Sequence, residues 1–426
     1  MLYERGAQMK KHIALVLLLL FLFPLSACGK QVTGAAYPAV YVHGYSGWGS
    51  YDARNASTPY WGLGSTNVEN SLRARDYQVY MASVGPVSSA WDRACELYAQ
   101  ITGSRVDYGA AHSKACGHER FGRDFTGNAL IPDYTWDSEH KIHLIGHSFG
   151  GATIRLLLDL LADGDAAEQA AGEDVSPLFT GGKADWVCSV TTISAPSNGT
   201  TAVYLPSSGG SISAGTDGSY DPRLDQFGIY ADSTEAADAA MRSAGFSEHY
   251  DNALNDMTVD RACSINAQIE MQPDVWYFNY YGTSTVSTDT ASVPNETMTL
   301  YLRDLAAAIG SYSGVTPGVW RSGFAEAMQI VNVPAQTLDG SWQPNDGMVN
   351  GVSAYCPYHL DGAGQRVHDA HADVTEESEY QPGVWNIFPD LGKDHFAVIG
   401  GIFTEQGTEV IQFYVRLMNR LCALPG

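Results

Sequence analysis

One short segment constrains the fold of this 426-residue chain more than any other, because it passes from strand to helix within a few residues. Residues 141–145 are an apolar run that predicts a buried strand. Residues 151–162 predict a helix with one buried face, since four apolar side chains follow the i, i+3, i+4, i+7 spacing: Ile154, Leu157, Leu158 and Leu161. Between the two lies Gly146-His147-Ser148-Phe149-Gly150, the single G-x-S-x-G sequence of the chain. A turn this tight needs glycines where side chains would collide, and it strains the serine.

The rest of the chain alternates apolar runs with helical patterns, which predicts an α/β protein with a mostly parallel central sheet flanked by helices. Residues 203–220 are rich in glycine and serine and predict a loop. No internal repeat and no Pro-rich linker divides residues 38–426, so we expect one domain. Three further strands and a C-terminal helix are expected at residues 39–42, 187–193, 329–333 and 409–421.

The charge of the chain excludes one class of partner. Lys and Arg number 24 against 47 Asp and Glu, which gives a net charge of −23 at pH 7. Such a surface repels phosphate backbones, so we expect no nucleic-acid partner. The composition, with 45% hydrophobic residues, excludes a disordered, collagen-like or coiled-coil chain.

The N-terminus predicts export. Residues 13–24 are one apolar run after two lysines. As a helix this run spans about 18 Å, too short for a hydrocarbon core of roughly 30 Å, so residues 1–27 are interpreted as a signal peptide. The sequence Leu25-Ser26-Ala27-Cys28 resembles a bacterial lipobox. It predicts lipidation of Cys28 and attachment to a membrane surface, with residues 28–37 as a short linker. Free secretion is the alternative.

The cysteines that follow Cys28 leave two states open. Their even number permits disulfides in an exported protein, but their wide separation is not typical of a small disulfide scaffold. Free buried thiols are the alternative. The six residues are Cys95, Cys116, Cys188, Cys263, Cys356 and Cys422.

The serine of the glycine-rich turn predicts nucleophilic catalysis. Ser148 lies at the positive end of a helix, and a serine hydroxyl needs a neighbouring base to take its proton. In this architecture the acid and then the base follow the serine along the chain. The best acid is Asp346, in a Pro-Asn-Asp-Gly turn, and its role is to hold the tautomer of the imidazole. The best base is His395, directly before an apolar run. The other downstream histidines are His359, His368 and His371, with His249 in a possible insert.

Two backbone N–H groups are expected to stabilise the oxyanion that forms in acyl transfer. One belongs to Phe149, the residue after the nucleophile. The other comes from the loop after an early strand, where Val42-His43-Gly44-Tyr45 makes Tyr45 the expected donor.

These residues and their surroundings resemble the bacterial true lipases of the staphylococcal and thermoalkaliphilic Geobacillus type. The resemblance is collinear over about residues 38–415. It implies an α/β-hydrolase fold, ester hydrolysis, and a catalytic triad of Ser148, Asp346 and His395. The matching stretches are VHGYSGWG (42–49), YWG (60–62), VGPVSSAWDRACELYAQ (84–100), VDYGAAHSKACGHERFGR (106–123), IHLIGHSFGGATIRLL (142–157), TTISAPSNGTT (191–201), NDGMVN (345–350) and residues 394–400.

The resemblance also implies a zinc ion held by two aspartates and two histidines of an insert beside the active site. The insert corresponds to about residues 84–125 and 245–256. Four such ligands complete a tetrahedral shell with no open position, so the zinc is expected to be structural. Cys116 is a rival ligand. The matching residues are Asp92, His112, His118 and Asp251.

Two departures from the family change what is expected. The family's calcium site uses acidic residues two and seven positions after the catalytic histidine, where this chain has Ala397 and Ile402, so we expect no such site. In the lid region, about residues 200–245, the Gly/Ser loop replaces a long amphipathic helix. Glycine and serine form helices poorly, and this weakens the expectation of interfacial activation. A helix at residues 235–244 is expected to cover part of the cleft.

The sequence as a whole predicts an exported, membrane-anchored, monomeric enzyme that cleaves triacylglycerols or other carboxylic esters through an acyl-enzyme. A carboxylesterase limited to short-chain or soluble esters is the alternative of the same class. Two alternatives belong to other classes: a surface lipid-binding lipoprotein without turnover, and a zinc hydrolase whose metal activates water.

Overall fold

The computed structural model describes residues 37–172, 174–205, 251–319, 331–401 and 407–425. Three predicted features lie outside the described residues: the signal peptide, the lipobox with Cys28, and Ile402, the second position at which the family's calcium site has an acidic residue. So do residues 206–245 of the predicted lid region, including the expected helix at 235–244.

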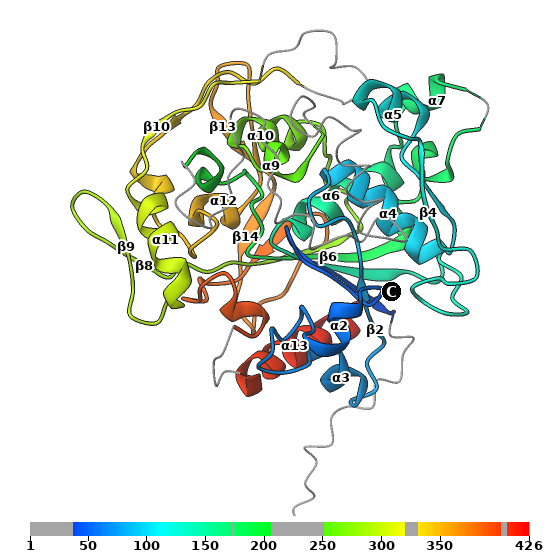
Figure 1. The fold of residues 1–426 in the computed structure, drawn as a ribbon, viewed down its shortest axis with the longest axis horizontal. Coiled ribbons are helices and arrows are strands. Elements are labelled where there is room, and N and C mark those ends of the chain that lie inside the picture. Colours follow the sequence, from blue (N-terminus) through cyan, green and yellow to red (C-terminus); the bar gives the residue numbers. More distant parts are fainter. Residues whose placement is uncertain (1–36, 173, 206–250, 320–330, 402–406, 426) are drawn as a thin grey trace, which may run out of the picture. The chain divides into compact units, whose positions relative to one another are not determined.

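A seven-stranded sheet forms the centre of the fold (Figure 1). Its order is β14-β15-β7-β6-β5-β1-β2, and each neighbouring pair is parallel. The predicted parallel sheet is therefore confirmed. The strands are β1 (Ala39–Val42), β2 (Val79–Ala82), β5 (Ile142–His147), β6 (Val187–Ile193), β7 (Trp276–Tyr280), β14 (His371–Asp373) and β15 (Trp385–Ile387).

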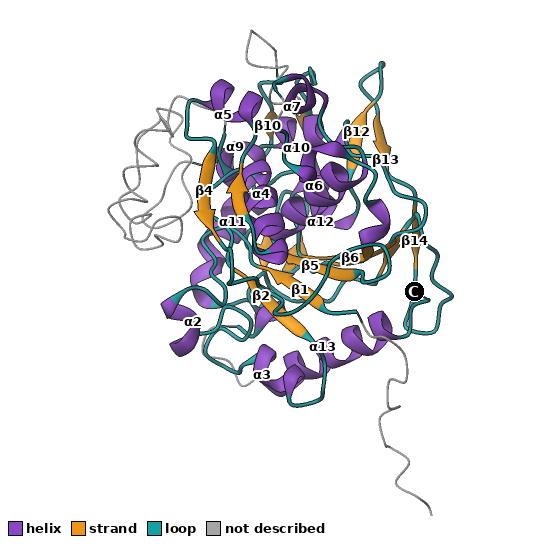
Figure 2. Cartoon of the chain, turned by 90° about the vertical axis from the view of Figure 1, so that its right-hand side faces the viewer, coloured by secondary structure: helices purple, strands orange, loops and turns teal. Residues whose placement is uncertain are grey.

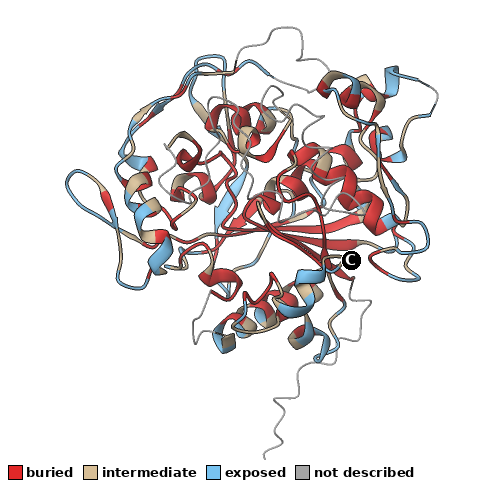
Figure 3. Ribbon diagram, in the orientation of Figure 1, coloured by how far each residue is buried: buried red, intermediate tan, exposed pale blue. Residues whose placement is uncertain are grey.

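Helices cover both faces of this sheet (Figure 2). The helices α4 (Ala90–Thr102) and α6 (Gly150–Ala162) lie on one face, and α3 (Val68–Arg73) and α13 (Gly407–Cys422) lie on the other. A cluster of buried apolar side chains fills each side, and Figure 3 shows the buried residues concentrated in the sheet and in α4 and α6. Because both faces are covered, every residue of β1, β5 and β6 is buried, including the histidines of β5 and the hydroxyl residues of β6.

The helix that follows the glycine-rich turn is buried more completely than its sequence predicts. The spacing predicts one buried face for α6, but residues 153–161 are all buried. The reason is tertiary: α6 packs against β5 and β6, against α4, and against the 3₁₀ helices η1 (Pro177–Thr180) and η2 (Ala184–Trp186). Two charged residues of α6, Arg155 and Asp159, are therefore buried as well.

Most of the remaining elements lie in the segments that connect the strands of the main sheet, and the last 3₁₀ helix follows β15. Short α-helices are α2 (Ala53–Ser57), α5 (Ala110–Cys116), α7 (Ala166–Ala170), α9 (Ala253–Asp256), α10 (Val259–Asn266), α11 (Arg303–Gly310) and α12 (Gly351–Tyr355). Further 3₁₀ helices are η3 (Thr201–Tyr204), η5 (Leu300–Leu302), η6 (Gly340–Trp342) and η7 (Ala397–Ile399). Two-stranded sheets pair β3 (Arg105–Asp107) with β4 (Phe121–Asp124), β8 (Thr285–Ser287) with β9 (Ser292–Pro294), β10 (Gly314–Val315) with β11 (Thr337–Leu338), and β12 (Tyr358–Leu360) with β13 (Arg366–His368).

One predicted strand is wrong in the part that the structure describes. Residues 331–333 form no strand of the main sheet, and Val333 makes an isolated bridge to Val319, with backbone hydrogen bonds of 2.8 and 3.0 Å. Pro334 follows directly and has no N–H to extend a ladder. Of the predicted loop at 203–220, residues 203 and 204 belong to η3, and residues 206–220 lie outside the described residues.

The cysteines are free thiols in the described part of the chain. Five are buried and Cys422 is partly exposed, and none of the six forms a disulfide there. No helix within these ranges is both long and apolar enough to cross a membrane.

Candidate active site

Ser148 occupies the sharp turn between β5 and α6. Its φ of +55° is a left-handed conformation that costs a non-glycine residue about 1–3 kcal/mol. Its N–H donates to the carbonyl of Ile193 on β6 at 2.9 Å. A Cβ on Gly146 would lie 2.5 Å from the backbone of Gly150, and a Cβ on Gly150 would lie 2.2 Å from the carbonyl oxygen of Val42. The glycines are therefore required for the strained turn.

Asp346 and His395 form a buried pair. His395 Nδ1 lies 2.8 Å from Asp346 Oδ2, and the two side chains are 2% and 1% exposed. Asp346 Oδ1 accepts hydrogen bonds from the N–H groups of Met348, at 3.0 Å, and Val349, at 2.7 Å. The N–H of His395 donates to the carbonyl of Asp346 at 2.9 Å. Because Nδ1–H donates to the carboxylate, Nε2 of His395 carries the lone pair of a base.

His147, the residue before Ser148, brings the loop of His395 to the turn. His147 Nε2 lies 3.0 Å from the carbonyl oxygen of His395, and the centroids of the two imidazoles are 4.8 Å apart. Within the described residues, Ser148 Oγ makes no hydrogen bond to His395. In serine hydrolases without substrate this bond is often long and shortens in the reactive complex.

The loop after β1 lies against the nucleophile. A Cβ on Gly44 would lie 2.5 Å from Ser148 Cβ and 3.0 Å from its Oγ, so only glycine fits at this position. Tyr45 directly follows Gly44. Phe149, the other expected oxyanion donor, is the N-cap of α6, where the first N–H groups of a helix have no partner within the helix. Both expected donors therefore lie next to Ser148.

A buried arginine supports this loop. Arg93 of α4 is 0% exposed, and its guanidinium donates to the carbonyls of His43 and Gly85 and to Thr153 Oγ1. It also lies 5.2 Å from the centre of the Phe149 ring. A permanently charged group at this place fixes the loop and favours negative charge near it. Sequence reasoning missed this role; the only signal was that Arg93 lies in a stretch that carries the family resemblance.

The loop of His395 is braced by the residue before it. Asp394 accepts hydrogen bonds from the N–H groups of Phe396 and Ala397, and from both the N–H and the hydroxyl of Thr299. Ala397, which stands where the family's calcium site has its first acidic residue, is a buried apolar residue. Three other downstream histidines lie elsewhere, in the β12–β13 hairpin and in β14: His359, His368 and His371. His249 lies outside the described residues.

The four predicted metal ligands converge. His112 Nε2 lies 3.2 Å from Asp251 Oδ2 and 3.4 Å from Asp92 Oδ1. His118 Nε2 lies 3.3 Å from Asp251 Oδ2 and 3.9 Å from Asp92 Oδ1. Zinc bonds of about 2.0–2.1 Å at tetrahedral angles place ligand atoms roughly 3.3 Å apart, so the donor set fits this ion.

Unsatisfied polar atoms in this cluster also fit a bound cation. Asp92 Oδ1, Asp251 Oδ1 and His118 Nε2 are buried and have no hydrogen-bond partner among the described residues. Burial, followed by the nearby Asp251 carboxylate, raises the pKa of Asp92 above its ordinary range. Buried polar atoms without partners are costly unless a metal or a proton compensates them.

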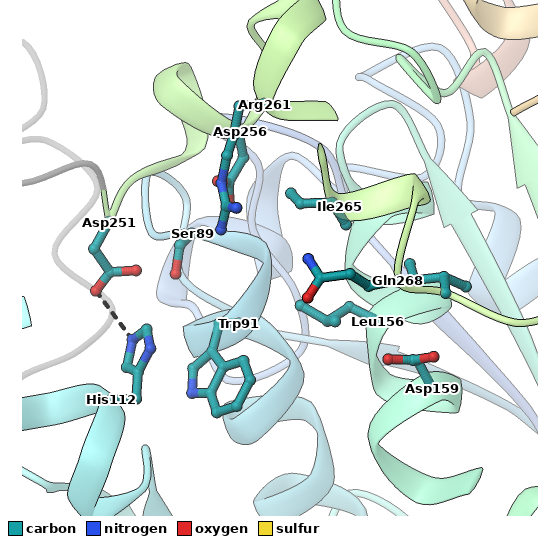
Figure 4. Close-up of a pocket in the computed structure, with 11 residues that line it drawn as sticks. Ser89, Trp91, His112, Leu156, Asp159, Asp251, Asp256, Arg261, Ile265 and Gln268 are labelled. Atoms are coloured by element: carbon teal, nitrogen blue, oxygen red, sulfur yellow. Dashed lines mark hydrogen bonds and ion pairs between the residues drawn. The ribbon is translucent and has the colours of Figure 1, made fainter. Parts of the chain in front are cut away.

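Several elements hold the cluster in place. Asp92 lies in the first turn of α4, His112 lies in α5, and Asp251 precedes α9. The Trp91 ring stacks on the His112 ring, with centroids 4.8 Å apart and planes at 13°. Glu168 accepts from the N–H groups of Ala111 and His112 and so fixes the start of α5. Figure 4 shows Asp251 and His112 facing each other at one end of a pocket that Trp91 and Leu156 also line.

Cys116, the rival ligand, lies beside the cluster. Its Sγ is 3.9 Å from His112 Nδ1, whereas Nε2 of the same ring faces the carboxylates. The thiol can be grouped with His112, His118 and Asp251, since one ligand atom of each lies within 4.8 Å of the others. Contact with the outer nitrogen of a ligand imidazole is typical of a residue that orients the ligand.

Comparisons with known proteins agree with one another. The family model described as "Lipase-like, C-terminal domain" matches residues 35–212. Lipase 2 of Staphylococcus aureus is 31% identical over 407 residues, which cover 90% of this chain and 54% of that protein. This chain therefore spans about half the length of the curated relatives that it matches.

Solved structures extend the similarity over nearly the whole chain. The lipase of Staphylococcus hyicus is 29% identical with a TM-score of 0.72, and the match covers 92% of this chain and 97% of that one. Lipase 1 of Pelosinus fermentans is 34% identical with a TM-score of 0.68, and the match covers 92% and 100%. The expected α/β-hydrolase fold is thereby confirmed. The chain belongs to the family of bacterial lipases that includes the staphylococcal enzymes.

Proposed function

We propose that this protein hydrolyses carboxylic esters of lipids, including triacylglycerols, through an acyl-enzyme on Ser148. One observation carries the proposal: His395 and Asp346 form a buried contact of 2.8 Å, and the loop of His395 is hydrogen-bonded to His147. His147 directly precedes Ser148, which has a φ of +55°. A carboxylate–imidazole pair on a loop that is bonded next to a strained serine is the arrangement that acyl transfer requires.

The reaction divides into two halves. In the first, Ser148 Oγ attacks the acyl carbon while His395 Nε2 removes the hydroxyl proton, and Asp346 stabilises the resulting imidazolium. The N–H groups of Tyr45 and Phe149 bind the tetrahedral oxyanion. His395 then gives its proton to the leaving oxygen, the ester C–O bond breaks and the alcohol departs. In the second half, the same imidazole activates water, which releases the carboxylic acid and restores the serine.

Zinc is proposed to have a structural role in this protein. Asp92, His112, His118 and Asp251 are the residues that would hold it, and together they join α4, α5 and the segment before α9. A bound ion of this type supplies a cross-link rather than a step of the reaction, since four protein ligands leave no position for substrate. The cross-link would also hold α4, which carries Arg93 beneath the oxyanion loop.

Export, lipidation of Cys28 and a monomeric state are also proposed. The apolar N-terminal run and the lipobox-like sequence support the first two. An anchor of this kind places the enzyme at a lipid surface without a transmembrane helix. Labelling with a radioactive or clickable fatty acid, in the wild type and in Cys28→Ser, tests the lipidation.

The test of function is a chain-length series of p-nitrophenyl esters together with triacylglycerol emulsions. We expect activity on emulsions that falls toward background in Ser148→Ala. A matched control is Ser194→Ala, because Ser194 is also buried, at φ +49°, and its Oγ has no partner among the described residues. Cleavage confined to acetyl and butyryl esters would favour the short-chain esterase. Full activity in Ser148→Ala would contradict the acyl-enzyme.

A further inference from the structure

Two buried side chains with no role in the proposed reaction steps connect the three loops of the active site. His147 is 0% exposed and Tyr60 is 4% exposed. Tyr60 Oη lies 2.7 Å from His147 Nδ1 and accepts from the N–H of Gly44 at 2.9 Å. On its other side, His147 Nε2 contacts the carbonyl of His395 at 3.0 Å. Gly44, Tyr60, His147 and His395, which are far apart in the sequence, thus form one continuous series of hydrogen bonds, a hydrogen-bonded chain.

The donor and the acceptor of each hydrogen bond in this series can be assigned. A carbonyl oxygen only accepts, so Nε2 of His147 carries the hydrogen that is donated to His395. Burial lowers the pKa of His147 well below its ordinary value, and the neighbouring His395 imidazole lowers it further, so the His147 ring is neutral. Nδ1 is then an acceptor, and the Tyr60 hydroxyl donates to it. The Tyr60 oxygen in turn accepts from Gly44.

The opposite tautomer does not fit. With the hydrogen on Nδ1, the lone pair of Nε2 would face the lone pairs of the His395 carbonyl at 3.0 Å. The hydroxyl hydrogen of Tyr60 would also lose its acceptor in a buried site. Each of these buried losses costs about 1–3 kcal/mol, so one arrangement dominates.

The two ends of this hydrogen-bonded series lie next to the groups that react. Gly44 lies against Ser148 and precedes Tyr45, the proposed oxyanion donor. The backbone of His395 is held on both sides, because its N–H donates to Asp346 and its carbonyl accepts from His147. A rigid link between these places sets the distance from the base to the nucleophile and to the oxyanion site.

We infer that Tyr60 and His147 are positioning residues, whose hydrogen-bonded chain fixes the oxyanion loop, the nucleophile turn and the His395 loop relative to one another. This role presupposes the proposed ester hydrolysis. Neither side chain exchanges a proton with the substrate. Their contribution is made in the transition state, where small errors of position cost most, and therefore affects kcat more than KM.

The first test removes a single hydroxyl. In Tyr60→Phe we expect kcat on a soluble p-nitrophenyl ester to fall about 10- to 100-fold, with KM nearly unchanged. A trifluoromethyl ketone, which binds serine hydrolases as an oxyanion adduct, should lose affinity in parallel. The matched control is Tyr41→Phe: Tyr41 is buried in the same apolar cluster, and its hydroxyl has no partner among the described residues. We expect it to keep wild-type kinetics.

The second test restores the hydrogen bonds in another form. His147→Gln keeps one donor and one acceptor and should retain most of the activity, whereas His147→Met keeps only the volume and should lose as much as Tyr60→Phe. Because both changes break the same chain, the double variant Tyr60→Phe/His147→Met should be little worse than either single variant. Additive losses, or equal activity of the Gln and Met variants, would overturn the inference.

The third test does not depend on activity. Nitrogen-15 NMR of the imidazoles should show His147 as a neutral ring protonated on Nε2, and the Nδ1-protonated form would overturn the inference. Measured beside these variants, Ser148→Ala distinguishes a failure of the proposed ester hydrolysis from a failure of the positioning role. Wild-type rates in Ser148→Ala would refute the proposed function. Loss of activity there, with folded Tyr60→Phe unchanged, would refute the positioning role alone.

Discussion

Removal of the zinc ion that we propose for the cluster of Asp92, His112, His118 and Asp251 is expected to destabilise the fold while leaving the chemical step intact. The two carboxylates contact the same pair of imidazoles at 3.2–3.9 Å. Three of the polar atoms there are buried without a hydrogen-bond partner in the described part of the chain. A divalent ion held by these four residues would coordinate Asp92 Oδ1 and His118 Nε2 and compensate both carboxylates, and it should bind the folded state preferentially because its ligands converge only there.

The size of the effect follows from linkage. Free zinc at 100 times its dissociation constant stabilises the folded state by about 2.7 kcal/mol, and at 1,000 times by about 4.1 kcal/mol. For a domain of about 390 residues, the unfolding entropy is roughly 0.8 kcal/mol/K. The melting temperature should therefore rise by about 3 °C and about 5 °C at these two concentrations.

The assay is calorimetry of the chelated protein titrated with zinc, with metal content measured after dialysis. His112→Ala should abolish the dependence of Tm on zinc, whereas His140→Ala should not, because His140 forms an exposed pair with Asp137. Below Tm, the rate of fluorophosphonate labelling should be the same with and without zinc. A Tm independent of zinc would refute the metal centre, and loss of turnover in a chelated but fully folded protein would refute its structural role.

Three further outcomes are expected. Asp346→Asn should lower kcat by roughly 10⁴-fold, because the amide leaves His395 in the wrong tautomer, and steady-state kinetics with a loss below about tenfold would contradict the assignment. Burial lowers the pKa of His143 to about 3, so the unfolded chain binds a proton below pH 6.5 that the folded chain does not, and stability falls as the pH drops from 6.5 toward 3. His143→Asn should make this dependence shallower by about 1.4 kcal/mol per pH unit in urea unfolding, and an unchanged slope would refute the assigned cause. Gly151→Ala places a Cβ 2.5 Å from that of Ala195 and should destabilise by about 1–3 kcal/mol. Gly172→Ala, whose Cβ meets no atom of the described residues within 4 Å apart from its chain neighbours, should be neutral in the same measurement.

Local patterns were sufficient to predict the centre of the fold. β1, β5 and β6 are short segments rich in apolar and β-branched residues, and α6 follows from its periodicity and from the glycines that precede it. In each case the information lies within about ten residues. The prediction failed at residues 331–333, where Pro334 limits the pairing to a single bridge. It also underestimated the burial of α6, since burial depends on neighbours from distant segments.

The site was predictable only in part, because its contacts join distant residues. Asp346 and His395 were selected from the motifs around them, and the structure places them in contact. No sequence pattern indicates that His147 bonds both Tyr60 and the carbonyl of His395, or that Arg93 holds the loop after β1. Such roles depend on three-dimensional proximity between side chains whose types are common in protein cores.

Covalent labelling with a fluorophosphonate, followed by mass spectrometry of the modified peptide, tests the proposed chemistry most directly. We expect one adduct per chain, on Ser148, and its formation should become very slow in folded His395→Ala, because the serine then lacks its base. An adduct on a different serine, or labelling that proceeds at the wild-type rate without His395, would contradict an acyl-enzyme mechanism at this site.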